Sequence, residues 1–184
     1  MKRYRLLFAG SGGQGIITAA ILLAKAAVMY EGLNAVQSQS YGAEARGGLS
    51  RSDVIISREE IYFPKVTQPN ILICLTQRAY NKFYNSIRPG GILIIDNFLV
   101  KQETSADAIT YELPLYNTLK EELNTSLGLN ICTLGVLIGL TNIISPESIK
   151  KVLKESIPPQ YLDLNYKAFD LGMKLCEGKK KYML

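Results

Sequence analysis

The alternation of apolar and polar stretches divides the chain into short strands and longer helices. Continuous apolar runs at residues 5–9, 71–75 and 92–95 are typical of strands buried in the centre of a sheet. Residues 16–30 are rich in Ala, Leu and Ile and contain no helix breaker, which predicts a helix that Gly32 ends. The chain therefore opens with a strand, a short glycine-rich segment and a helix.

Weaker patterns complete the series of elements. Further strands are expected at residues 35–37, 52–57 and 109–113, and residues 60–63 are expected to pair with 52–57 as a hairpin. Further helices are expected at residues 77–87, at 130–142, from Ser145 and Pro146 to about 156, and at 162–176, and a helical region is expected to begin at 118–123. The alternation predicts an α/β fold with an open, mostly parallel, Rossmann-like sheet and helices on both faces. One domain is expected over residues 1–178, followed by a flexible basic tail at 179–184.

Charge and apolar content exclude several classes of partner. The net charge of +5 is concentrated near the C-terminus, in Lys174 and residues 179–181, and no nucleic-acid-binding motif accompanies it. The apolar segment 131–140 is too short to span a bilayer, and the first strand is interrupted by glycines unlike a signal peptide. We therefore expect a cytoplasmic protein that binds neither nucleic acid nor membrane.

The supply of reactive side chains is small. The chain has no histidine, and its three cysteines, Cys74, Cys132 and Cys176, are far apart and form no CxxC pair. This excludes histidine-dependent nucleophilic catalysis, an ordinary zinc site and a four-thiolate iron–sulfur cluster. Asp96 follows a predicted strand, where it is either a site residue of an α/β sheet or the cap of a turn. We expect no catalytic residue, no metal ligand and no tightly bound cofactor in this chain.

The glycine-rich segment is the clearest binding motif. Gly10, Gly12 and Gly15 fit GxGxxG between a strand and a helix, with Gly13 and Gln14 between them. Such a loop brings backbone N–H groups and a helix N-terminus close to an anion, so it binds a phosphate, or it is a structural turn only. No Gly-Lys-Ser/Thr follows it, which excludes a P-loop.

A nicotinamide or flavin dinucleotide requires a further residue, a carboxylate at the end of the second strand. The second predicted strand ends in residues 37–39, Gln-Ser-Gln, and Glu31 precedes that strand. The sequence therefore disfavours a dinucleotide site.

A second polar segment follows at residues 38–48 and is expected to be a loop. It carries Glu44 and Arg46, and Arg51 lies just beyond it. The guanidinium of Arg46 is suited to bind a phosphate or carboxylate, or alternatively to pair with Glu44 at a subunit contact.

Together, these motifs resemble the gamma subunit of the 2-oxoacid:ferredoxin (acceptor) oxidoreductases. The resemblance rests on residues 10–16 (GSGGQGI) and 40–48 (SYGAEARGG), and on residues 130–135 (NICTLG) and 165–172 (NYKAFDLG). It covers nearly the whole chain. The Glu-Ala-Arg-Gly-Gly form of residues 44–48 looks most like the 2-oxoglutarate enzymes, whereas pyruvate enzymes tend to carry Glu-Arg-Arg-Gly.

The resemblance implies a function within a complex of the EC 1.2.7 type. It would convert 2-oxoglutarate and coenzyme A to succinyl-CoA and CO₂, with electrons passing to ferredoxin or another acceptor. Thiamine diphosphate, Mg and iron–sulfur clusters would belong to alpha, beta and ferredoxin-like delta subunits, and the isolated chain would be inactive. Carried over to this chain, the glycine-rich loop, Gly10, Gly12, Gly13, Gln14 and Gly15, would lie near the coenzyme A phosphates, with Arg46 as a further candidate.

Three alternatives remain open at this stage. The complex could act on pyruvate, a branched-chain 2-oxoacid or indolepyruvate instead. The chain could be a free-standing dinucleotide-binding oxidoreductase, or it could be an assembly scaffold that binds no ligand.

Overall fold

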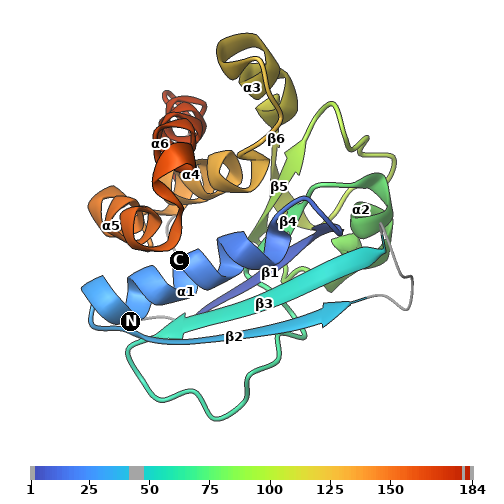
Figure 1. The fold of residues 1–184 in the computed structure, drawn as a ribbon. Helices are drawn as coiled ribbons and strands as arrows, with labels where there is room; N and C mark the ends of the chain where they lie inside the picture. The colour runs from blue at the N-terminus through green and yellow to red at the C-terminus, as the bar shows by residue number, and fades with distance from the viewer. Residues whose placement is uncertain (1–2, 42–47, 180, 183–184) are drawn as a thin grey trace.

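A six-stranded mixed sheet runs through the centre of the molecule in the order β2-β3-β1-β4-β5-β6 (Figure 1). The structure is a computed structural model, which describes residues 3–41, 48–179 and 181–182. The strands are β1 (Tyr4–Ser11), β2 (Asn34–Tyr41), β3 (Leu49–Ser57), β4 (Ile71–Cys74), β5 (Gly91–Asp96) and β6 (Ala108–Leu113). The helices are α1 (Ile16–Tyr30), α2 (Gln77–Phe83, continued by a 3₁₀ turn at Tyr84–Ser86), α3 (Leu115–Leu123), α4 (Leu129–Thr141), α5 (Pro146–Ser156) and α6 (Pro159–Lys174).

The sheet is mostly parallel, as predicted, with one antiparallel strand. β1, β4, β5 and β6 pair in parallel, and β3 runs antiparallel to both of its neighbours, β1 and β2. The expected hairpin of residues 60–63 with 52–57 is wrong, because residues 58–63 form no strand. Both edges of β3 are already paired, with β1 and with β2, so no edge is left for a third partner.

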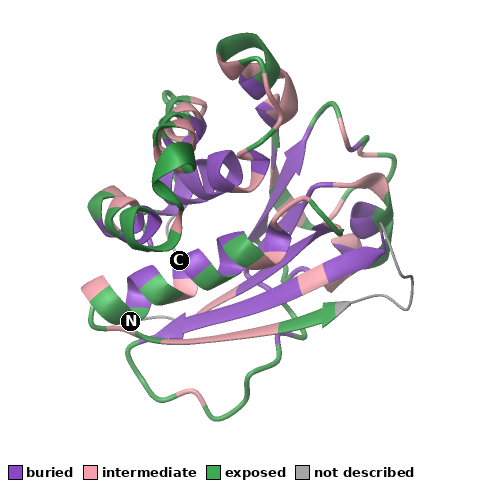
Figure 2. Cartoon of the chain, viewed as in Figure 1, coloured by how far each residue is buried: buried purple, intermediate pink, exposed green. Residues whose placement is uncertain are grey.

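Helices cover both faces of the sheet, and they are divided unequally. Side chains alternate along β1, so that Leu6 and Phe8 join the core beneath α1, α4 and α5, while Leu7 and Ala9 join the core beneath α2. The central strands β4 and β5 are buried along their whole length, and Figure 2 shows them enclosed between the two helical layers. Continuous burial explains why these two strands read as unbroken apolar runs.

The second strand is longer than the sequence predicts. Residues 38–41 were expected to begin a loop, but they continue β2, with Ser38 opposite Asp53 and Ser40 opposite Arg51. The polar, uncharged sequence Gln-Ser-Gln-Ser has a weak strand propensity of its own, so the ladder with β3 decides its conformation. Arg51 accordingly lies within β3 rather than in a loop.

Helices α4 and α6 approach each other closely because glycines face the contact. A Cβ added at Gly135 would lie 2.1 Å from the carbonyl oxygen of Phe169, and one added at Gly172 would lie 2.0 Å from the carbonyl oxygen of Cys132. At Gly139 the nearest atoms belong to the side chain of Cys176, at 2.9 Å. The two backbones therefore touch at positions where any side chain would separate the helices.

The side chain of Asp96 organises the chain at the end of β5. It is fully buried, and its Oδ1 accepts hydrogen bonds from the N–H groups of Phe98 and Leu99, both at 2.8 Å. Its Oδ2 accepts from the N–H of Tyr116 at 2.6 Å, in the first turn of α3. Of the two interpretations that the sequence allows, these bonds show Asp96 acting as a cap, which joins the 97–100 turn to the start of α3.

The three cysteines are free and buried. Burial raises the pKa of the Cys132 thiol to about 12 and that of the Cys176 thiol to about 11, and it raises the pKa of Cys74 as well. All three thiols are therefore protonated and unreactive at neutral pH.

The described helices bear on membrane insertion, and Tyr182 bears on the C-terminal tail. Among the described helices, none is long and apolar enough to cross a membrane. Within the predicted tail, the N–H of Tyr182 donates to the carbonyl of Leu140 at 2.8 Å, and its hydroxyl donates to the carbonyl of Gly90 at 3.2 Å. The flexibility of residues 179–184 as a whole stays a prediction.

We expect Gly135→Ala to lower the free energy of unfolding by about 3 kcal/mol, since the added methyl group meets backbone rather than a movable side chain. Intrinsic helix propensity predicts the opposite sign, a gain of about 1 kcal/mol. Urea denaturation measures the difference. Gly139→Ala should destabilise less, because its methyl group meets the Cys176 side chain at 2.9 Å and reaches backbone, the Met173 carbonyl, only at 3.5 Å. A Gly135→Ala protein more stable than the wild type would contradict the close contact of α4 and α6.

We expect Asp96→Ala to destabilise the fold by about 3 kcal/mol, because three N–H groups lose a charged acceptor. Asp96→Asn should not restore stability, since its amide N–H₂ would face either the Tyr116 N–H or the Phe98 and Leu99 N–H groups. Asp107→Asn, at an exposed position, is the matched control and should change stability by less than about 0.5 kcal/mol. Equal stabilities of the Asp96 and Asp107 variants in urea would contradict the role of Asp96.

Candidate functional site

The candidate site lies at the carboxyl ends of the parallel strands β1, β4 and β5. From β1 the chain passes through α1 to β2 and β3 on one side, whereas β4, β5 and β6 lie on the other. The order of the strands therefore reverses between β1 and β4, and ligands of open α/β sheets bind in the crevice outside such a point. The glycine-rich loop occupies this position (Figure 1).

The glycine-rich loop is a tight turn from β1 into α1. Gly10 and Ser11 still belong to β1, and the N–H of Gly12 donates to the carbonyl of Gly48 at 3.1 Å. Gly13 and Gly15 have φ angles of +88° and +72°, which favour glycine, and Gly15 is the residue before α1. The strand, loop and helix predicted for GxGxxG are thus confirmed.

Gln14 holds the loop in shape with both ends of its amide. Its Oε1 accepts from the N–H of Ser11 at 2.8 Å, and its Nε2 donates to the carbonyl of Leu75, just past the end of β4, at 3.0 Å. The side chain crosses above Gly10, where an added Cβ would come within 2.5 Å of Oε1. Gly10 and Gln14 therefore have a structural role, and their contact with a ligand stays a prediction.

Asn130 joins the loop to the start of α4. Its Nδ2 donates to the carbonyl of Gly15 at 3.3 Å, and a Cβ at Gly15 would lie 2.5 Å from the same nitrogen. The absence of a side chain at Gly15 therefore lets α4 approach the loop. Asn130 belongs to the segment quoted for the family resemblance, but its sequence position alone does not show that it meets the loop.

A pocket of about 300 Å³ lies between the loop and α4. The residues that line it are Gly13, Gln14, Gly15, Leu99, Tyr116, Ser126, Leu127, Gly128, Leu129 and Asn130. Only the first three were predicted from the sequence to bind a ligand, because Leu99, Tyr116 and residues 126–130 reach the pocket through the fold. Among these described residues none is charged.

Two helices begin at this pocket. α1 starts after Gly15 and α4 after Gly128, which also has a positive φ of +91°. Neither glycine offers a capping side chain, and the first turn of neither helix carries an acidic residue. Each helix N-terminus bears a partial positive charge and N–H groups without an intrahelical acceptor. The pocket is therefore suited to a phosphate or another anion.

β2 itself carries no carboxylate along its length, which runs through Gln37 to Tyr41. Gln37 instead donates through Nε2 to the hydroxyl of Ser52 at 2.7 Å. Glu31 lies at the other end of the strand and accepts from the N–H of Ser145 at 2.9 Å. Although partial burial raises the pKa of the Glu31 carboxyl, hydrogen bonds from Ser148 and Ser145 outweigh it and lower the pKa. Glu31 therefore caps α5 and does not bind a ribose.

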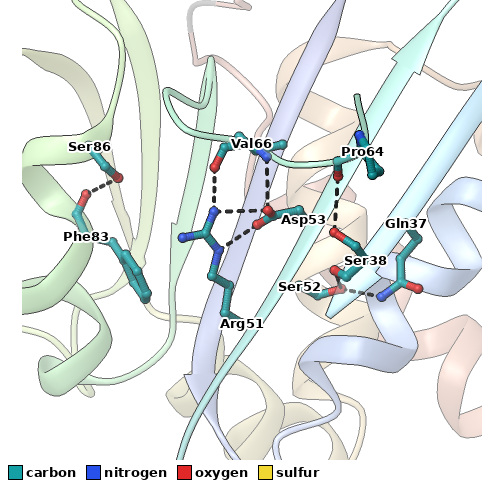
Figure 3. Close-up of polar contacts among 9 residues, drawn as sticks. All are labelled: Gln37, Ser38, Arg51, Ser52, Asp53, Pro64, Val66, Phe83 and Ser86. Carbon is teal, nitrogen blue, oxygen red and sulfur yellow. Dashed lines mark hydrogen bonds and ion pairs between the residues drawn. The ribbon is translucent and has the colours of Figure 1, made fainter. Parts of the chain in front are cut away.

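A second polar cluster lies on the face of the sheet that α2 covers, at β3 and the loop that follows it (Figure 3). Arg51 forms a two-pronged ion pair with Asp53, with Nε–Oδ1 and Nη2–Oδ2 distances of 2.7 and 3.0 Å. Arg51 also donates to the carbonyl of Val66, whose N–H donates to Asp53 at 3.0 Å. The guanidinium lies 5.4 Å from the ring centroid of Phe83. The pair fastens the 58–70 loop to β3 beside a pocket of about 540 Å³.

The remaining predicted site residues belong to the segment 42–47. Arg46 and Glu44 lie outside the described residues, so the choice between their two interpretations stays open. Within residues 3–41, 48–179 and 181–182, no three His, Cys, Asp or Glu side chains are grouped in a way that could hold a metal ion.

Known proteins resemble this chain along almost its whole length. 2-Oxoglutarate synthase subunit KorC of Methanocaldococcus jannaschii is 42% identical over 177 residues, which are 95% of each chain. The gamma subunit of a keto/oxoacid ferredoxin oxidoreductase from Geobacter sulfurreducens superposes with a TM-score of 0.84 at 38% identity, covering 94% of this chain and 98% of that one.

A third relative contains the same fold within a longer chain. The 2-oxoglutarate:ferredoxin oxidoreductase from Magnetococcus marinus, solved with 2-oxoglutarate, coenzyme A and succinyl-CoA bound, superposes with a TM-score of 0.89 at 28% identity. The match covers all of this chain and 32% of that one. The sequence profile of the pyruvate ferredoxin/flavodoxin oxidoreductases matches residues 5–175. The chain belongs to the pyruvate ferredoxin/flavodoxin oxidoreductase family.

Proposed function

We propose that the chain is the gamma subunit of a 2-oxoglutarate:ferredoxin oxidoreductase complex of the EC 1.2.7 type. The complex oxidatively decarboxylates 2-oxoglutarate, transfers the succinyl group to coenzyme A and passes the electrons to ferredoxin or a similar acceptor. The likeness to KorC over 95% of both chains supports this substrate, as does the likeness to the Magnetococcus marinus enzyme with coenzyme A bound. The complex belongs in the cytoplasm.

The chemistry of the complex requires groups that this chain is poorly equipped to hold. Thiamine diphosphate supplies the carbon–carbon bond cleavage, and iron–sulfur clusters carry the electrons. The chain has no histidine and only three, buried, cysteines. We therefore assign thiamine diphosphate, Mg and the clusters to alpha, beta and ferredoxin-like delta subunits, and expect the isolated chain to be inactive.

The contribution of this chain is to bind coenzyme A at the glycine-rich loop. The observation that carries this proposal is the pocket in which the N-termini of α1 and α4 meet. The first N–H groups of α1 and α4, which have no intrahelical acceptor, would donate to a diphosphate, and the two helix dipoles favour its negative charge. A diphosphate bound in this way is oriented without a charged side chain.

The rival function, a free-standing dinucleotide-binding oxidoreductase, has less support. β2 has no carboxylate, Gln37 is bonded to Ser52, and Glu31 is engaged at α5. The related 2-oxoacid oxidoreductases remain the closer alternative, and they differ from the proposal in substrate only.

Reconstitution of the complex with and without this chain tests the proposal. We expect CoA-dependent oxidation of 2-oxoglutarate, followed through ferredoxin reduction, to fall at least tenfold without the chain. Pyruvate, 2-oxoisovalerate and indolepyruvate, tested at the same concentration, should be poorer substrates. Unchanged 2-oxoglutarate oxidation in the absence of the chain would overturn the proposal, and preference for another 2-oxoacid would change the assigned substrate.

Gly13 allows the role of the loop to be tested by charge alone. A side chain there meets no atom within 4 Å, and both Asp and Asn tolerate a positive φ better than most residues. We expect Gly13→Asp to raise the KM for coenzyme A about tenfold, because its carboxylate repels a phosphate, a change of about 1.4 kcal/mol. Gly13→Asn has the same shape without the charge and should raise it far less. Equal KM values for the two variants, in complexes that assemble normally, would make the loop a structural turn only.

A further inference from the structure

Two aromatic side chains form an exposed stack beside the pocket. The rings of Phe98 and Tyr116 lie 5.1 Å apart between centroids, with an interplanar angle of 9°. Phe98 is 60% exposed, so much of its ring is open to solvent. Offset stacking stabilises the pair by only about 1 kcal/mol, which does not by itself explain an exposed phenylalanine.

Hydrogen bonds to Asp96 fix the backbone of both residues of the stack. The N–H groups of Phe98 and Tyr116 both donate to the buried carboxylate of Asp96, at 2.8 and 2.6 Å. One side chain therefore fixes the two backbones that present the rings, although they come from the end of β5 and the start of α3. Because the two rings are already fixed, the protein loses little conformational entropy when a ligand stacks on them.

The stack borders the pocket in which the coenzyme A diphosphate is proposed to bind. Tyr116 and Leu99, the neighbours of Phe98 in space and in sequence, line that pocket, and Leu127 lines it too. Leu127 is 65% exposed, so a second apolar side chain is available at the same opening. A molecule with its phosphates at the helix N-termini would extend over aromatic and aliphatic groups.

A lysine provides a positive charge beside the stack. Lys120, one turn further along α3, is exposed, and its Nζ lies 5.8 Å from the centroid of the Tyr116 ring. A flat aromatic surface, a lysine and a pocket suited to an anion therefore lie side by side. These three features are suited to a purine nucleotide that carries a second phosphate on its ribose.

We propose, resting on the proposed function, that Phe98 and Tyr116 are the stacking platform for the adenine ring of coenzyme A and that Lys120 pairs with its 3′-phosphate. The flexible pantetheine arm, which has amides rather than a flat ring, gains less from such a surface. The adenine end of coenzyme A therefore lies at the β5–α3 side of the pocket, and the thiol end is directed away from it, toward the catalytic subunits.

The test compares variants in the reconstituted complex. Phe98→Ala should raise the KM for coenzyme A about tenfold with kcat unchanged, since base–aromatic stacking is worth about 1–3 kcal/mol. It should raise the inhibition constant of 3′,5′-ADP by a similar factor. Phe98→Tyr should restore both values, and Phe98→Leu, which keeps the bulk without the ring, should not. Tyr161→Ala, an exposed aromatic on α6, is the control and should change neither.

The phosphate contact has its own test. Wild type should prefer coenzyme A to 3′-dephospho-CoA as acyl acceptor, and Lys120→Ala should reduce this preference several-fold by weakening coenzyme A alone. The proposal is overturned if the Phe98 and Lys120 variants bind coenzyme A and 3′,5′-ADP like the wild type, or if their only effect is loss of complex assembly, as a partner-subunit contact would give. Normal values in these variants with a raised KM in Gly13→Asp would overturn the stacking platform and leave coenzyme A binding at the glycine-rich loop intact. Normal values in all three variants would remove coenzyme A from this pocket, and the role as gamma subunit would then depend on the reconstitution test alone.

Discussion

The candidate site depends on the two hydrogen bonds of the Gln14 side-chain amide. The amide connects the N–H of Ser11 to the carbonyl of Leu75, so that the loop after β1 is fastened to the end of the neighbouring parallel strand. This arrangement requires Gly10 beneath the amide and Gly15 beside Asn130, because a side chain at either position would strike its neighbour. The motif is therefore needed for its shape before any ligand is considered.

The shape of the loop in turn decides where the helices begin. With Gly15 against Asn130, α1 and α4 start at one pocket, although these two residues are 115 positions apart in the sequence. Asp96 places the start of α3 at the same opening. Three helices are thus positioned by short polar contacts at the end of the sheet, while the apolar contacts beneath them supply the stability of the fold.

The sequence predicts the features that depend on local chemistry. The bounds of α1, the Ser145 cap and Pro146 at the start of α5, and the buried parallel strands β4 and β5 agree with the structure because each is determined by neighbouring residues. The strand at residues 38–41 could not be predicted, since its polar residues are ordered only by pairing with β3. The hairpin at 60–63 failed for the related reason that β3 had other partners.

Features that depend on the packing of distant segments lie beyond a single sequence. Gly135 and Gly172 read as ordinary helix-weakening residues, and only the contact of α4 with α6 shows why side chains are absent there. The pairing of Phe98 with Tyr116 joins residues on two different elements, and no spacing in the sequence indicates it. The glycine-rich loop was found from its pattern, but the other wall of its pocket, residues 126–130, was not.

The burial of every cysteine has a practical consequence. The side chains of Cys74, Cys132 and Cys176 are enclosed in the two cores, so alkylating reagents and dissolved oxygen meet no thiolate in the folded protein. A cysteine introduced at an exposed position would therefore be the most reactive thiol of the chain, without removal of the native ones. Spectroscopic labels can be attached at one chosen point, and the distance from this subunit to its neighbours in the assembled complex then becomes measurable in solution.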